Sequence, residues 1–330
     1  MTDLGSLAQQ TADRLAAKRA GVVVAAVAGE AVEIRAAGRA STDAVFEVGS
    51  VTKVFTALTL ARLTVAGMTG LDEPLADLLP PGAQVPSRDG IKITLRHLAT
   101  HTSGLPRLPT GMLLQALLHP ATPDPYAGCT TDRLLQSLAR TRLGATPGRR
   151  FRYSNFGAGL RGLALAYRAG TDYETLIARE IGAPLGLTDT GVTVPPGRLI
   201  QGHTGRGRPT PPWNLADLAG AGGLRSTAAD MVTFLRAQLA GESDPAIRLT
   251  REVKHRINPF AWAHLGWMGR RLHARQGGHL QLWHNGGTGG FSSFVGFDPE
   301  KSVAVVALSS TQRPVDGPAS DLLAALQATR

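Results

Sequence analysis

The most informative stretch of this 330-residue chain is Phe46-Glu47-Val48-Gly49-Ser50-Val51-Thr52-Lys53-Val54-Phe55-Thr56-Ala57. It predicts a short extended segment, a turn at Gly49 and then a helix with an apolar pattern. Residues three apart lie on one face of a helix, so the Ser50 hydroxyl and the Lys53 amine are expected within hydrogen-bond reach. A serine becomes a nucleophile when a base takes its proton, and a lysine is such a base when burial or nearby charge lowers its pKa. The helix N-terminus would also direct backbone N–H groups at an anion formed there.

A simpler alternative is that Ser50 caps a helix and that Lys53 is a solvated surface residue. Lysine is scarce, however, because the 35 basic residues comprise five lysines and thirty arginines. Random placement would give S-x-x-K only about 0.2 times in a chain of this composition. An arginine in place of Lys53 would stay protonated and could not act as a base. The residues that follow, Val54, Leu58 and Leu60, predict a buried helix, on which a lysine needs a partner or a function.

A second element, Tyr153-Ser154-Asn155, is the single Y-x-N of the sequence, where about 0.05 would be expected by chance. It follows the turn-forming Pro147-Gly148 and precedes an apolar run, which predicts an extended piece ahead of a helix. A cationic lysine beside Tyr153 would lower the pKa of its phenol and let it relay protons to a leaving group. The alternative is a tyrosine whose ring packs and whose hydroxyl is satisfied, which is the commoner role.

A third element is Trp283-His284-Asn285-Gly286-Gly287-Thr288-Gly289-Gly290-Phe291, with four glycines in five positions. The loop contains neither of the phosphate-binding patterns G-x-x-x-x-G-K-[ST] and G-x-G-x-x-G. It is typical of a strand edge where glycines let a substrate approach closely and one N–H points at a developing oxyanion. The alternative is a plain turn.

With these three elements in this order and separation, the chain resembles the serine β-lactamase and penicillin-binding-protein superfamily. It is most similar to the class C β-lactamase branch and its relatives, the family VIII esterases and D-stereospecific peptidases. That branch has S-x-x-K, Y-x-N and a third K-T-G or H-x-G element, matched here by Ser50/Lys53, Tyr153/Asn155 and His284-Asn285-Gly286. Two further runs, at 93–106 and 221–231, look like family signatures, and the resemblance extends from about residue 20 to about residue 310.

The resemblance implies a β-lactamase/transpeptidase-like fold and an enzyme that forms a covalent acyl-enzyme on Ser50. Lys53 is then the base, and Tyr153 passes the proton to the leaving group. The backbone N–H groups of Ser50 and Gly287 form the oxyanion hole. The expected substrate-binding residues are Asn155, His284 and Asn285. The chemistry needs no metal and no organic cofactor.

Two departures from the family pattern concern the substrate. The lysine of K-T-G is replaced by His284, which resembles the esterase and peptidase members more than the class C β-lactamases. Asn285 stands where small hydroxyl residues or glycine are usual, and we expect it to alter how a substrate carboxylate is bound. His101 and Ser103 look like a Ser/His pair, but the resemblance implies a structural role for that run. No G-x-S-x-G occurs, which excludes an α/β-hydrolase nucleophile elbow.

The order of predicted elements indicates an α+β fold (an α/β sandwich). Strands are predicted at 21–29, 31–37, 264–270, 279–284 and 291–308, helical patches at 130–142 and 157–186, and a closing helix at 317–328. This order predicts one antiparallel sheet built from both termini and flanked by helices, with an inserted, mostly helical subdomain. We expect a single domain over 1–330, with 1–65 and 221–330 in the α/β subdomain and 66–220 in the helical subdomain.

Composition narrows the partners and the location. The formal charge of +10 comes from scattered arginines, which favours a solvated surface over a nucleic-acid site. The exception is the cluster of Arg149, Arg150 and Arg152 beside Tyr153, which is either solvated or attracts an anionic substrate. Cys129 is alone and cannot form an internal disulfide. Residues 1–20 predict an amphipathic helix without a signal-peptide pattern, so we expect a cytoplasmic protein with no membrane partner.

The sequence therefore predicts a serine acyl-transfer enzyme, in the first place an esterase or amidase acting on a small-molecule ester or amide. One alternative is an acyltransferase of secondary metabolism, in which an amine or alcohol acceptor resolves the acyl-enzyme. A second alternative is a non-catalytic, ligand-binding descendant, against which the intact Ser50, Lys53 and Tyr153 argue. The acyl group is expected to depend on the loops around 107–128 and 187–215. The oligomeric state stays open.

Overall fold

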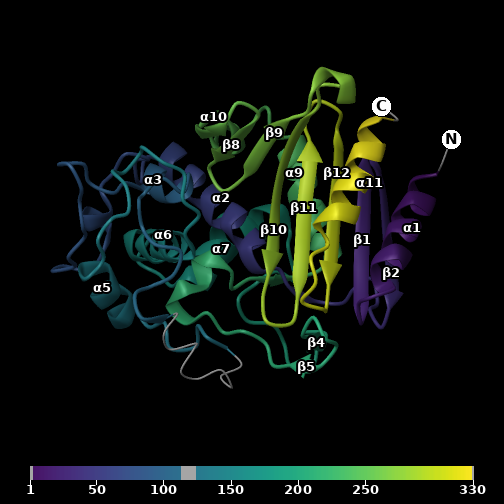
Figure 1. Cartoon of the computed structure of the whole chain (residues 1–330), viewed down its shortest axis with the longest axis horizontal. Coiled ribbons are helices and arrows are strands. Elements are labelled where there is room, and N and C mark those ends of the chain that lie inside the picture. The colour runs from purple at the N-terminus through teal and green to yellow at the C-terminus, as the bar shows by residue number, and fades with distance from the viewer. Residues whose placement is uncertain (1–2, 113–123, 329–330) are drawn as a thin grey trace.

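The chain folds around one large antiparallel sheet, seen in a computed structural model that describes residues 3–112 and 124–328 (Figure 1). In this described part, eight strands run in the order β2-β1-β12-β11-β10-β9-β8-β7, and each pair is antiparallel. The strands of this sheet are β1 Gly21–Ala28, β2 Ala31–Gly38, β7 Lys254–Asn258, β8 Ala261–His264, β9 Met268–Arg271, β10 Leu280–Gly287, β11 Ser292–Asp298 and β12 Val303–Ser309. Shorter pairs are β3 Phe46–Glu47 with β6 Arg225–Ser226, and β4 Gly202–His203 with β5 Pro209–Thr210.

Strands from both ends of the chain lie side by side in the sheet. β1 pairs with β12 along its length, from Val22↔Ser309 to Ala28↔Val303, which confirms the sheet built from both termini. The strands predicted at 21–29 and 31–37 are confirmed as β1 and β2. The prediction of a single strand at 264–270 is wrong, because Gly266, with φ 78°, turns the chain between β8 and β9. The run 291–308 likewise divides into β11 and β12.

β1 is buried on both faces, because alternate side chains of a strand point to opposite sides of the sheet. Val22 and Val24 belong to a core cluster with residues of α1 Leu4–Ala16 and α11 Asp316–Ala328. Val23 belongs to the cluster that contains residues of α2 Thr52–Val65 and α9 Ala228–Leu239. The helices therefore cover both faces of the sheet, as Figure 1 shows.

A second core lies beside the sheet, where helices α3, α5 and α6 gather around the far side of α2 (Figure 1). The helix predicted at 130–142 is found as α5, whereas the run 157–186 is divided, because the chain turns at Gly170 after α6. The subdomain boundaries at 66 and 220 stay a prediction. The remaining helices are α3 Leu95–Ala99, α5 Thr131–Ala139, α6 Asn155–Arg168, α7 Tyr173–Ile177, α8 Ala183–Leu185 and α10 Pro245–Glu252.

The amphipathic N-terminal helix is confirmed as α1, whose Ala8, Ala12 and Leu15 are buried on one face. None of the helices in residues 3–112 and 124–328 is both long and apolar enough to cross a membrane.

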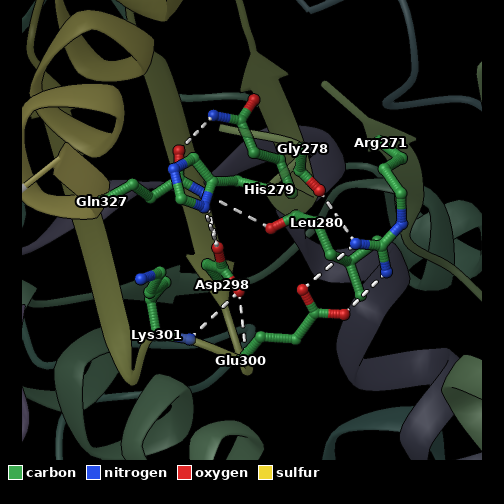
Figure 2. A network of polar contacts seen from close by, with 9 residues as sticks. Arg271, Gly278, His279, Leu280, Asp298, Glu300, Lys301 and Gln327 are labelled. Atoms are coloured by element: carbon green, nitrogen blue, oxygen red, sulfur yellow. Dashed lines mark hydrogen bonds and ion pairs between the residues drawn. The ribbon is translucent and has the colours of Figure 1, made fainter. Parts of the chain in front are cut away.

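A buried polar network holds one end of the sheet together (Figure 2). The fully buried Asp298, at the end of β11, accepts from the Gln327 side chain of α11 at 2.7 Å and from the backbone N–H of Glu300 at 2.8 Å. Gln327 accepts in turn from Gln281 of β10 at 2.8 Å, and Arg271 of β9 binds Glu300. The network ties α11 to three strands and leaves the opposite end of the sheet for the candidate site.

Candidate active site

Ser50 lies in a short 3₁₀ turn that leads into α2. Gly49 has φ 50°, and a Cβ at this position would lie 2.6 Å from the backbone nitrogen of Gly287. Glycine is therefore required for the turn to pack against the end of β10. Ser293 of β11 fastens the turn, since its hydroxyl donates to the carbonyl oxygen of Val48 at 2.7 Å. Ser50 is thus held where the sheet meets the helical part of the molecule.

The Lys53 side chain is fully buried and contacts Ser50. Its Nζ lies 2.9 Å from Ser50 Oγ and also donates to the carbonyl oxygen of Ala221. Neither contact is with a carboxylate that would stabilise a positive charge. Burial, followed by the charges of Arg161 and Arg107, lowers the pKa of Lys53 well below its usual value. A neutral amine beside a serine hydroxyl is able to take its proton.

Arg161 on α6 is a second buried basic residue, which the sequence did not single out. Its side chain is 1% exposed, and Nη2 donates to the carbonyl oxygen of Lys53 at 2.9 Å. Its Nε has no hydrogen-bond partner within the described residues. Burial lowers the pKa of Arg161 to about 10, which still leaves the group charged at neutral pH. This charge therefore disfavours a proton on Lys53.

Tyr153 lies just ahead of α6, beside the Ser50–Lys53 pair. Ser154 caps the helix by accepting from the backbone N–H of Gly157 at 2.9 Å, which fixes the chain at this point. Lys53 Nζ lies 5.1 Å from the centroid of the Tyr153 ring. The expected lowering of the Tyr153 pKa is wrong: burial raises it to about 12, although a hydrogen bond with Ser50 acts in the other direction. Tyr153 is therefore a protonated phenol and a proton donor.

His101 and Ser103 form no hydrogen bond with each other in the described part of the chain. The buried His101 accepts from the backbone N–H of Ser154 through Nδ1 at 3.2 Å, and its ring centroid lies 4.4 Å from that of Tyr153. Burial lowers the pKa of His101 well below its usual value, so the ring stays neutral. Ser103 Oγ accepts from the N–H of Leu105. His101 thus positions Tyr153, which agrees with a structural role for this run.

His284 and Asn285 lie near the end of β10. His284 Nδ1 donates to the carbonyl oxygen of Asn285 at 2.7 Å, and the buried Nε2 has no hydrogen-bond partner within the described residues. Burial and the charge of Lys53 lower the pKa of His284 to about 3. His284 is therefore a neutral acceptor where the K-T-G element would supply a cation. The Asn285 amide donates to Asp316 Oδ1 at 2.6 Å, which brings a carboxylate to this side of the site.

The end of β10 is an exposed sheet edge within the described chain. Its pairing with β9 ends at Trp283, which leaves the stretch from His284 to Gly287 unpaired on that side. A Cβ on Gly286 would lie 3.0 Å from the backbone nitrogen of Ser50, so glycine is needed for the two segments to approach. The N–H groups of Ser50 and Gly287 belong to these adjoining segments, which is the arrangement that the predicted oxyanion hole requires.

A cavity of about 570 Å³, the catalytic cavity, opens over Ser50. The 107–128 loop contributes Arg107 and Tyr126 to its wall, and the 187–215 loop contributes Trp213. Residues 113–123 of the first loop lie outside the described part of the chain. The remaining lining residues are Tyr153, Asn155, Asn285, Gly286, Gly287, Thr288, Ser292, Gln312, Pro314 and Asp316.

The arginine that lines the catalytic cavity is not one of the three that the sequence singled out beside Tyr153. Arg149, Arg150 and Arg152 are exposed and do not line it. Arg107 lines the cavity, and its guanidinium lies 5.3 Å from the centroid of the Tyr153 ring. No group of His, Cys, Asp and Glu side chains suited to a metal ion occurs in the described ranges.

Comparison with known proteins agrees with this arrangement. The family model described as "Beta-lactamase" matches residues 7–329, and the chain belongs to that family. Its members are serine enzymes related to β-lactamases and D-alanyl-D-alanine peptidases, and they work through an acyl-enzyme. The β-lactamase/transpeptidase-like fold expected from the sequence is thereby confirmed.

Three similar proteins illustrate the range of the family. The D-alanyl-D-alanine-carboxypeptidase/endopeptidase AmpH of Escherichia coli K12 is 31% identical over 280 residues, which span 80% of this chain and 70% of AmpH. A solved β-lactamase/D-alanine carboxypeptidase from Yersinia pestis is 26% identical, with a TM-score of 0.81 and 98% of each chain covered. A D-stereospecific amidohydrolase from Streptomyces sp. is 27% identical, with a TM-score of 0.79 and coverage of 94% of this chain and 95% of that one.

Proposed function

We propose that the protein is a serine hydrolase that cleaves small-molecule esters or amides through an acyl-enzyme on Ser50. The observation that carries this proposal is the 2.9 Å contact between Ser50 Oγ and the amine of the fully buried Lys53. Lys53 accepts the Ser50 proton as Oγ attacks the carbonyl carbon, and the N–H groups of Ser50 and Gly287 stabilise the oxyanion. Tyr153 gives its phenolic proton to the leaving group and regains one from Lys53, which becomes neutral again. Water then releases the acyl group.

The surface that faces the substrate favours esters and amides over penicillins. A penicillin carries a carboxylate, for which the neutral His284 offers no fixed cation. Asp316, held by Asn285, adds a negative charge to the wall of the catalytic cavity. Arg107 is the cation that lines this cavity, and it lies on the Tyr153 side. Activated esters have a good leaving group and need little help from a protonated donor, so they are expected to react faster.

Steady-state kinetics with p-nitrophenyl butyrate and with nitrocefin test this preference. We expect a higher kcat/KM for the ester and little or no hydrolysis of penicillins or cephalosporins. A higher kcat/KM for nitrocefin would overturn the esterase proposal. D-alanine p-nitroanilide should be included, because the similarity to a D-stereospecific amidohydrolase supports amide cleavage. Turnover that rises sharply with added amine or alcohol would favour the acyltransferase alternative.

Covalent labelling tests whether the protein is catalytic at all. A fluorophosphonate should add once per chain and on Ser50, as measured by intact mass and peptide mapping. The Ser50→Ala variant is the control and should stay unlabelled. Absence of a serine adduct on the unmodified protein would favour the ligand-binding descendant.

A further inference from the structure

A second cavity, of about 530 Å³, lies apart from Ser50. Four segments meet around it: the residues after α1, the end of β2, the β4–β5 hairpin and the residues after β12, at the lower end of the sheet in Figure 1. No acidic residue is among those that line it. Its five cationic side chains are Lys18, Arg19, Arg39, Arg206 and Arg313.

Two of these guanidinium groups are held in place by backbone carbonyls. Arg19 donates to the carbonyl oxygens of Leu15 at 2.9 Å and of Arg313 at 3.4 Å, and the Arg313 Nε donates to that of Gly205 at 2.7 Å. Burial and the charge of Arg313 lower the pKa of Arg19, which shows that the two positive groups are close enough to repel. They form a prearranged positive wall, and prearrangement reduces the entropy lost on binding.

The other three cations have no counter-charge in the described chain. Lys18, Arg39 and Arg206 form no side-chain hydrogen bond and no ion pair there. Lys18, Arg39 and Arg206 are exposed, and like charges gathered around a cavity raise the positive potential inside it. Their repulsion is relieved when an anion occupies the space between them.

The second cavity shares a wall with the catalytic cavity. Along the segment after β12, Thr311 and Arg313 line the second cavity, whereas Gln312 and Pro314 line the catalytic one. A ligand in the second cavity would therefore contact Thr311 and Arg313, whose neighbours along the chain line the catalytic cavity.

We propose that this second cavity, the basic pocket, binds a small molecule that carries a phosphate or diphosphate group. Guanidinium groups are planar forks that match phosphate oxygens, and four of the five cations are arginines. The volume falls within the range of small-molecule sites, roughly 300–1,000 Å³. The ligand belongs to a site separate from Ser50, so the proposal stands independently of the proposed hydrolase activity.

Isothermal titration of the full chain with inorganic pyrophosphate tests the proposal, at a constant ionic strength of about 0.15 M so that general screening is the same throughout. We expect saturable binding that is at least tenfold tighter than that of chloride or acetate. Arg39→Gln/Arg206→Gln should weaken it at least tenfold, and this variant is expected to fold because neither side chain makes a hydrogen bond within the described residues. The matched control is Arg256→Gln/Arg275→Gln, which removes two exposed charges that line neither cavity and should change the affinity less than twofold.

A second measurement distinguishes a separate phosphorylated ligand from a phosphate carried by the substrate. KM is compared for a p-nitrophenyl alkanoate with a terminal phosphonate and for the same ester without it. A lower KM for the phosphonate ester that is lost in Arg39→Gln/Arg206→Gln assigns the phosphate to the substrate. Equal KM values with tight pyrophosphate binding assign it to a separate ligand. Pyrophosphate affinity that is equal in the wild type and in Arg39→Gln/Arg206→Gln, or that falls equally in the control, would overturn the proposal.

Discussion

Replacing Arg161 by methionine is expected to raise the pKa of Lys53 and to shift the pH dependence of catalysis. The guanidinium donates to the carbonyl oxygen of Lys53 at 2.9 Å and stays charged at neutral pH. Methionine has a similar length and no charge, so it fills the space without the repulsion. It also removes a buried nitrogen, Nε, that has no partner in the described chain, and with it the desolvation cost of that unsatisfied group.

The expected size of the effect follows from Coulomb's law. A charge that contacts the carbonyl oxygen of a lysine lies on the order of one side-chain length from its amine. At roughly 7 Å and an effective dielectric constant of about 20, two such charges repel by about 2.4 kcal/mol. Removing Arg161 should then raise the pKa of Lys53. At a pH below the Lys53 pKa of both the wild type and the variant, the variant should react about 50-fold more slowly, which is the factor that this repulsion energy corresponds to. At high pH, where Lys53 is neutral in both proteins, the rate should recover.

The assay is the pH profile of kcat/KM for p-nitrophenyl butyrate. The acid limb reports the pKa of the base in the free enzyme and should move to higher pH in Arg161→Met. Arg161→Gln is the matched control, because glutamine keeps a donor for the Lys53 carbonyl but lacks the charge. If the charge is responsible, both variants move the limb equally. A limb that stays in place while kcat falls at every pH would refute the electrostatic reasoning and indicate a structural role.

Three further predictions concern the site and its stability. Ser50→Ala should fold normally and lose acyl-enzyme formation, with a rate at least about 10³-fold lower; an adduct on another residue by intact mass would contradict it. Lys53→Arg should be nearly as damaging as Lys53→Ala, since arginine keeps a charge but is no base; an Arg variant with most of its activity would make Lys53 a fixed cation. The pKa values of His101, His264 and His284 are lowered by burial, so below about pH 6.5 the unfolded chain binds protons that the folded chain does not. As the pH falls, the free energy of unfolding should therefore decrease by up to about 1.4 kcal/mol per pH unit for each histidine. The decrease should continue down to the folded-state pKa, which is about 4 for His264 and about 3 for His284. Urea unfolding measured between about pH 7 and pH 5 would contradict this if the free energy did not decrease.

The sequence predicted those parts of the fold and the site that depend on local spacing. Ser50 and Lys53 are one helical turn apart, so their contact follows from the helix itself. The pairing of β1 with β2 follows from two β-branched runs joined at Gly29. The division of 264–270 was missed because a turn centred on one glycine is not visible in a short apolar run.

What the sequence could not give depends on tertiary burial. Arg161 is one of thirty arginines, and only the packing of α6 against α2 makes it the buried neighbour of Lys53. The direction of the Tyr153 pKa was wrong for the same reason. The sequence pattern predicts a cationic lysine beside the phenol, whereas in the folded chain burial lowers the pKa of Lys53 and raises the pKa of Tyr153.

The position of Arg161 explains how the lysine base keeps a lowered pKa although the position of the K-T-G lysine holds the neutral His284. In the K-T-G pattern a lysine stands where this chain has His284. Here His284 is neutral in that place, and Asp316, which accepts from Asn285, lines the catalytic cavity. A charge that lowers the Lys53 pKa is still present, because Arg161 supplies it from within α6, where it is buried and does not line the catalytic cavity. A change in the charges of the cavity wall would therefore leave burial and Arg161, the two largest causes of the lowered Lys53 pKa, in place, and would affect the contribution of Arg107 alone, which lines the cavity.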